Sequence, residues 1–284
     1  IISDDTQNLY EYEEWGEHVI INKLTSADNV LNVYYYNPYP TSPEDFFELY
    51  VTIKDNPNTV LADDADNSTT ITNLQGQTVD VILKGRTLYK DDKWNTLCLP
   101  FDVTDGNTGD EVSFTGTPLE GATVMTLDGE TSGFDSGTGV LTLNFIDVTS
   151  NNTIAAGTPF IVKWTGTDVT NPVFSDVTIS STAAGSVLSA DNNVRFQGTY
   201  SPTVIYSTTN DNLFLGAENK LYWPSTEGYT LGACRAYFHV DLNGGAAAVR
   251  QFVLNFGDDN EQTNGIVEMR NEEGEMRNVN GEMR

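Results

Sequence analysis

The chain has 284 residues, of which 38% are hydrophobic, and its formal net charge is −27. This length and apolar content suffice for one large domain or two smaller ones. So acidic a surface repels phosphate backbones and anionic lipid headgroups, which disfavours nucleic-acid and membrane-surface binding and favours a monomer. No stretch approaches the roughly 18 consecutive apolar residues that cross a bilayer.

The N-terminal region differs from the rest of the chain. The sequence starts at Ile1-Ile2-Ser3, so we expect a processed protein or a fragment. Residues 1–62 are acidic and aromatic, with a dense tyrosine patch at residues 34–39. We expect them to form a small β segment, with a linker or turn at residues 63–68.

Alternation of apolar and polar residues dominates the chain. Period-two runs predict half-buried strands, and these runs cover residues 47–53, 79–83, 141–145, 160–164, 173–179, 234–240 and 252–256. Turn-forming Gly, Asn and Asp residues separate the runs. Short alternating strands with such turns are typical of antiparallel sandwiches and barrels. The sequence therefore predicts an all-β fold, with one main antiparallel β-sandwich at residues 63–257.

One segment is especially strand-like. Residues 85–101 contain two apolar runs on either side of Asp91-Asp92. This arrangement predicts a β-hairpin with a two-residue acidic turn.

The C-terminal region repeats the triplet Glu-Met-Arg at residues 268–270, 275–277 and 282–284. Each repeat has almost no hydrophobic residue besides Met, and its glycine costs about 1 kcal/mol in a helix. Such a segment buries too little apolar surface to become ordered. We expect residues 258–284 to be a disordered tail.

Two oxygen-rich loops are candidates for a structural calcium ion. Asp102, Asp105, Asp110 and Glu111 lie in one loop, and residues 63–67 form a second group. Carboxylate oxygens suit a hard cation, but neither loop has EF-hand spacing. Calcium is the sole cofactor that the sequence suggests.

A polar row lies in the strand-like run near the C-terminus. Arg235, Tyr237, His239 and Asp241 alternate with apolar residues and so share one strand face. This row could bind a ligand. The alternative is a solvated sheet face with cross-strand pairs, which is the more common arrangement.

Two aromatic residues are candidates for sugar stacking. Tyr222 and Trp223 precede Pro224 at a predicted strand end. Aromatic rings offer an apolar face with a polar edge, which suits carbohydrate. Packing inside the protein is the alternative for both residues.

Cys98 and Cys234 are the two cysteines of the chain, and both lie in apolar runs. Neither has a CxxC partner or a neighbouring histidine, so zinc and thioredoxin-type chemistry are disfavoured. An exported protein could pair them as a disulfide, and buried free thiols are the alternative.

The sequence offers no evident catalytic group. Its two histidines, His18 and His239, have no adjacent nucleophile motif, and no GxSxG elbow occurs. Among forty-one acidic residues, no pair stands out as the two carboxylates of a glycosidase. We expect a protein that is not an enzyme.

Seven short motifs stand out between residues 60 and 256. They are Gly85 to Tyr89, Trp94 to Phe101, Leu119 to Ala122, Ala156 to Val162, Phe196 to Tyr200, Leu213 to Gly216 and Ala233 to Phe238. Together they resemble a β-rich module near the C-terminus of exported or surface proteins of Bacteroidetes-type bacteria, some of them BspA-like leucine-rich-repeat proteins. The resemblance covers about residues 60–256. The C-terminal sorting segment that often follows such modules is not part of this sequence.

The resemblance implies an extracellular or cell-surface location and supplies no catalytic residues. Combined with the sequence, it favours a non-enzymatic structural or adhesive β-sandwich module. A carbohydrate-binding module that uses exposed aromatic residues is the alternative, and a glycoside hydrolase is a third hypothesis. The expected partners are an extracellular glycan or a surface protein of a host or neighbouring cell.

Overall fold

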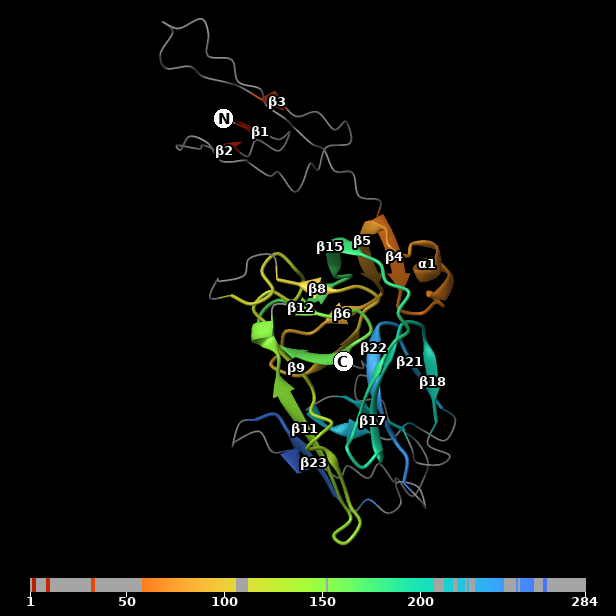
Figure 1. Cartoon of the computed structure of the whole chain (residues 1–284). Coiled ribbons are helices and arrows are strands. Elements are labelled where there is room, and N and C mark those ends of the chain that lie inside the picture. The colour runs from red at the N-terminus through yellow and green to blue at the C-terminus, as the bar shows by residue number, and fades with distance from the viewer. Residues whose placement is uncertain are drawn as a thin grey trace, which may run out of the picture. The chain divides into compact units, whose positions relative to one another are not determined.

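A computed structural model gives the fold (Figure 1). It describes residues 58–105, 112–151, 153–206, 212–216, 219–222, 224, 228–242, 249 and 251–257, together with strands β1, β2, β3 and β24. The chain divides into two compact units, residues 1–54 and 55–284. The division precedes the predicted boundary at residue 62, because residues 58–62 form a strand of the second unit.

The first unit contains a small antiparallel sheet. Its strand order is β2-β1-β3. The strands are β1 (Ile2–Ser3), β2 (Leu9–Tyr10) and β3 (Asn32–Val33). The strand predicted at residues 47–53 lies outside the described residues.

A three-stranded sheet with the order β15-β5-β4 begins the second unit. Its strands are β4 (Asn58–Ala62), β5 (Thr78–Lys84) and β15 (Val173–Thr178). The short helix α1 (Ser68–Asn73) joins β4 to β5, so these two strands run parallel. The side chain of the buried Asn67 fixes the turn before α1. Its Oδ1 accepts the Ala62 N–H, and its Nδ2 donates to the carbonyls of Ala62 and Tyr200.

The central sheet has seven strands in the order β24-β23-β11-β9-β13-β7, with β10 beside β11. They are β7 (Asn95–Cys98), β9 (Thr123–Leu127), β10 (Gly133–Asp135), β11 (Val140–Asp147), β13 (Pro159–Lys163), β23 (Gln251–Asn255) and β24 (Thr263–Asn264). Strand β24 falls inside the predicted disordered tail, whose other residues lie outside the described part.

A five-stranded sheet follows the order β16-β17-β22-β19-β20. Its strands are β16 (Ser186–Leu188), β17 (Val194–Thr199), β19 (Asn212–Leu215), β20 (Leu221–Tyr222) and β22 (Arg235–Val240). Three ribbons complete the unit, namely β6 (Thr87–Leu88) with β14 (Val169–Thr170), β8 (Val103–Thr104) with β12 (Thr153–Ile154), and β18 (Thr203–Ile205) with β21 (Tyr229–Leu231). A 3₁₀ turn, η1 (Thr149–Asn151), follows β11.

Strand β13 of the central sheet is buried on both faces, and its successive side chains point in opposite directions. In β13, Phe160 and Val162 belong to the first hydrophobic core, which also contains apolar residues of β4, β5 and β15. Ile161 between them belongs to the second core, which contains apolar residues of β11, β17, β22 and β23. The unit thus has a core on each side of one shared sheet.

The all-β prediction is confirmed. α1 is the one α-helix among the described residues, and in that part of the chain no helix is long and apolar enough to cross a membrane. The described strand pairs are antiparallel except β4–β5 and β11–β23. This packing is consistent with the predicted β-sandwich and adds a third layer to it.

The predicted hairpin at residues 85–101 is wrong. β6 pairs with β14 and β7 pairs with β13, so the two apolar runs have separate partners. The buried side chain of Asn95 bonds to the N–H and the carbonyl of Tyr89, which shapes the intervening loop. Asp92 donates its N–H to the Trp164 carbonyl, which draws the acidic turn toward β13.

Candidate functional site

A cavity of about 330 Å³ lies where the end of β4, the β5–β6 turn, and strands β21 and β22 meet. We call it the Arg86–Arg235 cavity. Its lining residues are Asp63, Asp64, Gly85, Arg86, Thr87, Tyr89, Tyr229, Thr230, Gly232 and Arg235. Two of the motifs that carry the resemblance therefore contribute residues to one cavity. These motifs are Gly85 to Tyr89 and Ala233 to Phe238.

An ion pair fixes one wall of this cavity. Nη2 of Arg235 lies 2.9 Å from Oδ1 and 2.8 Å from Oδ2 of Asp63. Two hydrogen bonds hold the backbone of Asp63. Its N–H donates to the Lys84 carbonyl, and its carbonyl accepts the Ala233 N–H. Gly232 allows this approach, because a Cβ there would lie 2.5 Å from both Asp63 carboxylate oxygens.

Burial and the neighbouring charge have opposite effects on the pKa of Arg235. Burial lowers the pKa of its guanidinium, whereas the neighbouring Asp63 carboxylate raises it. The side chain of Arg235 is 8% exposed and that of Asp63 is 22% exposed. A buried arginine needs such a carboxylate, because an uncompensated charge in the interior is costly.

Arg86 provides a second guanidinium, which is almost completely buried. It is 1% exposed, and its Nη2 donates to the Thr96 carbonyl at 3.1 Å. Its buried Nε has no hydrogen-bond partner among the described residues. Asn171 holds the turn on which Arg86 sits, because its Oδ1 accepts the Gly85 N–H at 2.7 Å and its N–H donates to the Arg86 carbonyl.

The accessible part of the cavity is polar and has spare hydrogen-bonding capacity. The side chains of Asp64, Thr87, Tyr229 and Thr230 make no hydrogen bond or ion pair with any residue that the structure describes. All four are at least partly exposed. A carboxylate, two aliphatic hydroxyls and a phenol thus surround a space that a small ligand can enter.

Tyr229 has a well-defined ring position. It stacks on Phe214 of β19, with ring centroids 5.0 Å apart and planes at 19°. Burial and, to a smaller extent, the charge of Asp63 raise the pKa of its phenol. The phenol therefore remains a neutral hydrogen-bond donor at physiological pH.

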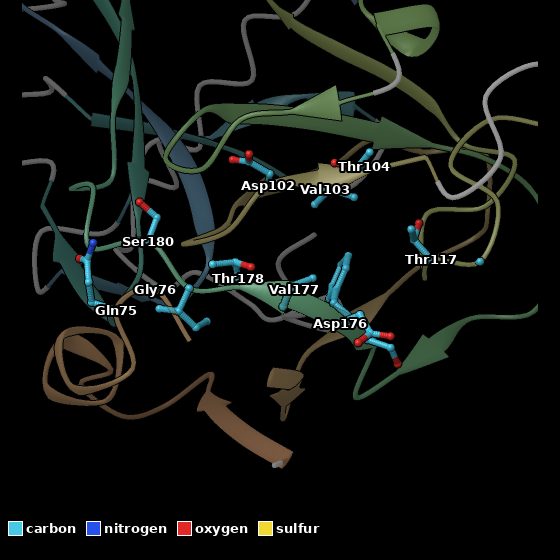
Figure 2. A pocket seen from close by; sticks show the side chains of 14 residues that line it. Gln75, Gly76, Asp102, Val103, Thr104, Thr117, Asp176, Val177, Thr178 and Ser180 are labelled. Carbon is cyan, nitrogen blue, oxygen red and sulfur yellow. The ribbon is translucent and has the colours of Figure 1, made fainter. Parts of the chain in front are cut away.

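A larger cavity of about 550 Å³ lies near β8 and β15 (Figure 2). Several of its polar side chains are already used by the fold. Asp102 accepts the Ala156 N–H at 2.7 Å, Thr178 bonds to Thr78 at 3.2 Å, and the Thr117 hydroxyl donates to Phe114. We therefore regard the Arg86–Arg235 cavity as the stronger candidate site.

The two predicted calcium loops have structural roles in the described residues. Asp105 is buried and accepts the N–H groups of Phe114 and Thr115, which anchors this loop. Asp110 and Glu111 lie outside the described residues. The group at residues 63–67 is divided between the ion pair and the turn before α1. No cluster of three metal-binding side chains occurs in the part of the chain that the structure describes.

The predicted polar row is divided in the structure. Arg235 is buried against Asp63, so it does not lie on a solvated face. Tyr237 and His239 are half-buried, and His239 Nδ1 lies 3.1 Å from Asn212 Oδ1. Asp241 is exposed beyond the end of β22.

Of the two aromatic candidates, Tyr222 is described and Trp223 lies outside the described residues. Tyr222 stacks on Phe214 with centroids 5.7 Å apart. Phe214 thus has rings of Tyr222 and Tyr229 stacked against it. The sequence pattern pointed to Tyr222, but it gave no signal for Tyr229.

The two cysteines are free buried thiols. Their backbones meet, because the Cys98 N–H donates to the Cys234 carbonyl at 3.4 Å. The side chain of Cys98 lies against Gly198 of β17, whereas Cys234 belongs to the first core. Burial raises the pKa of Cys98 to about 12. Neither thiol is therefore available as a nucleophile at neutral pH.

Comparisons with known proteins identify no relative. No family model matches the chain, and neither the search of curated proteins nor that of solved structures found a significant match.

Proposed function

We propose that this chain is a non-enzymatic adhesive module of an exported bacterial surface protein and that it attaches through the Arg86–Arg235 cavity. The observation that carries the proposal is the group Asp64, Thr87, Tyr229 and Thr230, whose side chains have no hydrogen-bond partner among the described residues. They surround a wall that is fixed by the Asp63–Arg235 ion pair. A preorganised wall lowers the ordering cost of binding. Sites of this kind orient a ligand through a few well-placed polar groups.

The proposal favours attachment over chemistry because of how the charged groups are used. The carboxylate of Asp63 is bonded to Arg235, and Arg86 is enclosed by the protein. A general acid or base must reach the proton that it transfers. Asp64 is the remaining carboxylate in the cavity lining, and a retaining or inverting glycosidase needs two.

The test is a binding assay of the purified chain against immobilised extracellular glycans and collagen. We expect saturable binding that Asp64→Asn weakens by about tenfold, as for loss of a hydrogen bond to a charged group. Asp241→Asn is the matched control, since Asp241 is exposed and lies outside the cavity. Mass spectrometry of the recovered ligand should show no change. Ligand cleavage that Asp64→Asn abolishes would instead establish an enzyme.

A further inference from the structure

The charge balance of the Arg86–Arg235 cavity restricts the kind of ligand that it can hold. The cavity contains two arginines, but neither guanidinium is accessible. Arg235 is paired with Asp63, and Arg86 is 1% exposed. The accessible charge is the carboxylate of Asp64, on a chain whose net charge is −27. An anionic ligand would therefore be repelled at this entrance.

The accessible polar groups suit a ligand with many hydroxyl groups. A carboxylate accepts two or more hydrogen bonds, and a hydroxyl can both donate and accept one. Asp64 can thus receive hydroxyl protons, while Thr87 and Thr230 can exchange hydrogen bonds with the neighbouring oxygens. Water satisfies these exposed groups in the free protein, and a purely apolar ligand would remove that water without replacing its hydrogen bonds.

The ring of Tyr229 supplies an apolar surface. One of its faces is stacked on Phe214. Tyr229 also lines the cavity and is half-buried, so part of the residue remains accessible to a ligand. An aromatic face is apolar with a polar edge, and the C–H face of a sugar ring matches it.

We infer that the ligand is a neutral carbohydrate, with one sugar ring over Tyr229 and its hydroxyls bonded to Asp64, Thr87 and Thr230. The inference rests on the proposed function and names the ligand class of the same cavity. The volume of about 330 Å³ lies at the lower end of small-molecule sites. One or two sugar units of a longer glycan are therefore the part that the cavity holds.

The experiment compares neutral oligosaccharides of glucose, galactose, mannose and N-acetylglucosamine with oligogalacturonides by calorimetry. We expect at least one neutral series to bind, with an affinity that changes little between low and high salt, because a neutral ligand has no charge to screen. Thr230→Val should weaken it several-fold through loss of one hydroxyl. Thr153→Val, at an exposed threonine of β12 outside the cavity, is the matched control.

Two variants of Tyr229 separate the contribution of its ring from that of its phenol hydroxyl. Tyr229→Phe keeps the ring and should lose only the hydrogen bond of the phenol, whereas Tyr229→Leu should remove most of the binding. Circular dichroism of each variant checks that the fold is retained.

The outcomes distinguish the ligand class from the proposed function. Binding of oligogalacturonides in preference to every neutral series, or a protein ligand that Asp64→Asn blocks, would overturn the inference and leave the adhesive role intact. Binding of neutral sugars that no cavity variant changes would overturn both. Equal effects of Thr230→Val and Thr153→Val would also overturn the inference.

Discussion

The carboxylate of Asp63 and the guanidinium of Arg235 form an ion pair of 2.8 Å between residues 172 positions apart in the sequence. The pair joins the end of the three-stranded sheet to the start of β22. It thereby connects the first core to the five-stranded sheet beside the Arg86–Arg235 cavity.

Removing one partner of this pair should strongly destabilise the fold. We expect Asp63→Ala to lower the free energy of unfolding by about 3–5 kcal/mol, because Arg235 then keeps a buried charge without its counterion. Urea denaturation measures this. The double variant Asp63→Leu with Arg235→Met should lose less stability than Asp63→Ala alone, since no charge remains buried. An unchanged midpoint for Asp63→Ala would contradict the structural role of the pair.

The contact between Gly198 and Cys98 predicts a steric effect. A Cβ on Gly198 would lie 2.3 Å from Cys98 Sγ. We expect Gly198→Ala to cost about 1–3 kcal/mol of stability through overpacking. Adding Cys98→Ala should recover part of that loss, because the nearest atom is then absent. Thermal unfolding of the two variants tests this, and identical melting temperatures would argue against the contact.

Asp191 predicts a pH dependence of stability. Its carboxylate is partly buried, which by itself raises its pKa, but hydrogen bonds from Phe134, Ser189 and Asn193 lower the pKa below its ordinary value. A lowered pKa means that the folded state binds the proton more weakly. The stabilisation is present above the unfolded pKa of about 3.9 and is lost as the pH falls through the folded pKa.

The matching variant is Asp191→Asn. Its stability deficit relative to the parent chain should be large at pH 7. The deficit should begin to shrink below about pH 4, where the carboxylate of the unfolded parent chain becomes protonated, and should continue to shrink as the pH falls through the lower folded pKa. Denaturation at both pH values measures the deficit. A deficit that stays constant with pH would show that the charge of Asp191 is unimportant.

The cysteines should be unreactive in the folded protein. Burial raises the pKa of Cys98 to about 12 and also raises that of Cys234. We expect no reaction with a thiol reagent at pH 8 until a denaturant is added, and then two thiols per chain. Fewer than two thiols in the denatured, unreduced protein would reveal the disulfide that the structure does not contain.

Core truncations should affect both hydrophobic cores. Leu99 in the first core and Phe238 in the second are both fully enclosed. Replacing either with alanine should cost about 3 kcal/mol or more, from lost burial and a residual cavity. Calorimetry checks the size of the effect. Exposed Leu188→Ala serves as the control and should cost much less.

The strands could be predicted from the sequence because period two is a local property. The alternating runs at residues 79–83 and 141–145 lie in β5 and β11, and residues 252–255 of the third run lie in β23. The apolar residues that alternate in these three runs are buried. The run at residues 173–179 was only partly predictable. A bulge between Phe174 and Val177 shifts the register, so that Val173 is exposed.

Strand partners and the candidate site could not be predicted in the same way. The hairpin prediction failed because residues 95–98 pair with β13, and no local pattern encodes that choice. Arg235 was identified as part of a polar row, but its partner Asp63 is distant in sequence. Tyr229 lies in a three-residue strand, which is too short to show a period.

The sheet shared by the two cores has a mechanical consequence. Strand β13 gives alternate side chains to each core, so removing it from one would also expose the other. We therefore expect the two cores to unfold together. Under a pulling force, residues 58–257 should therefore rupture in one step, with no partly extended intermediate.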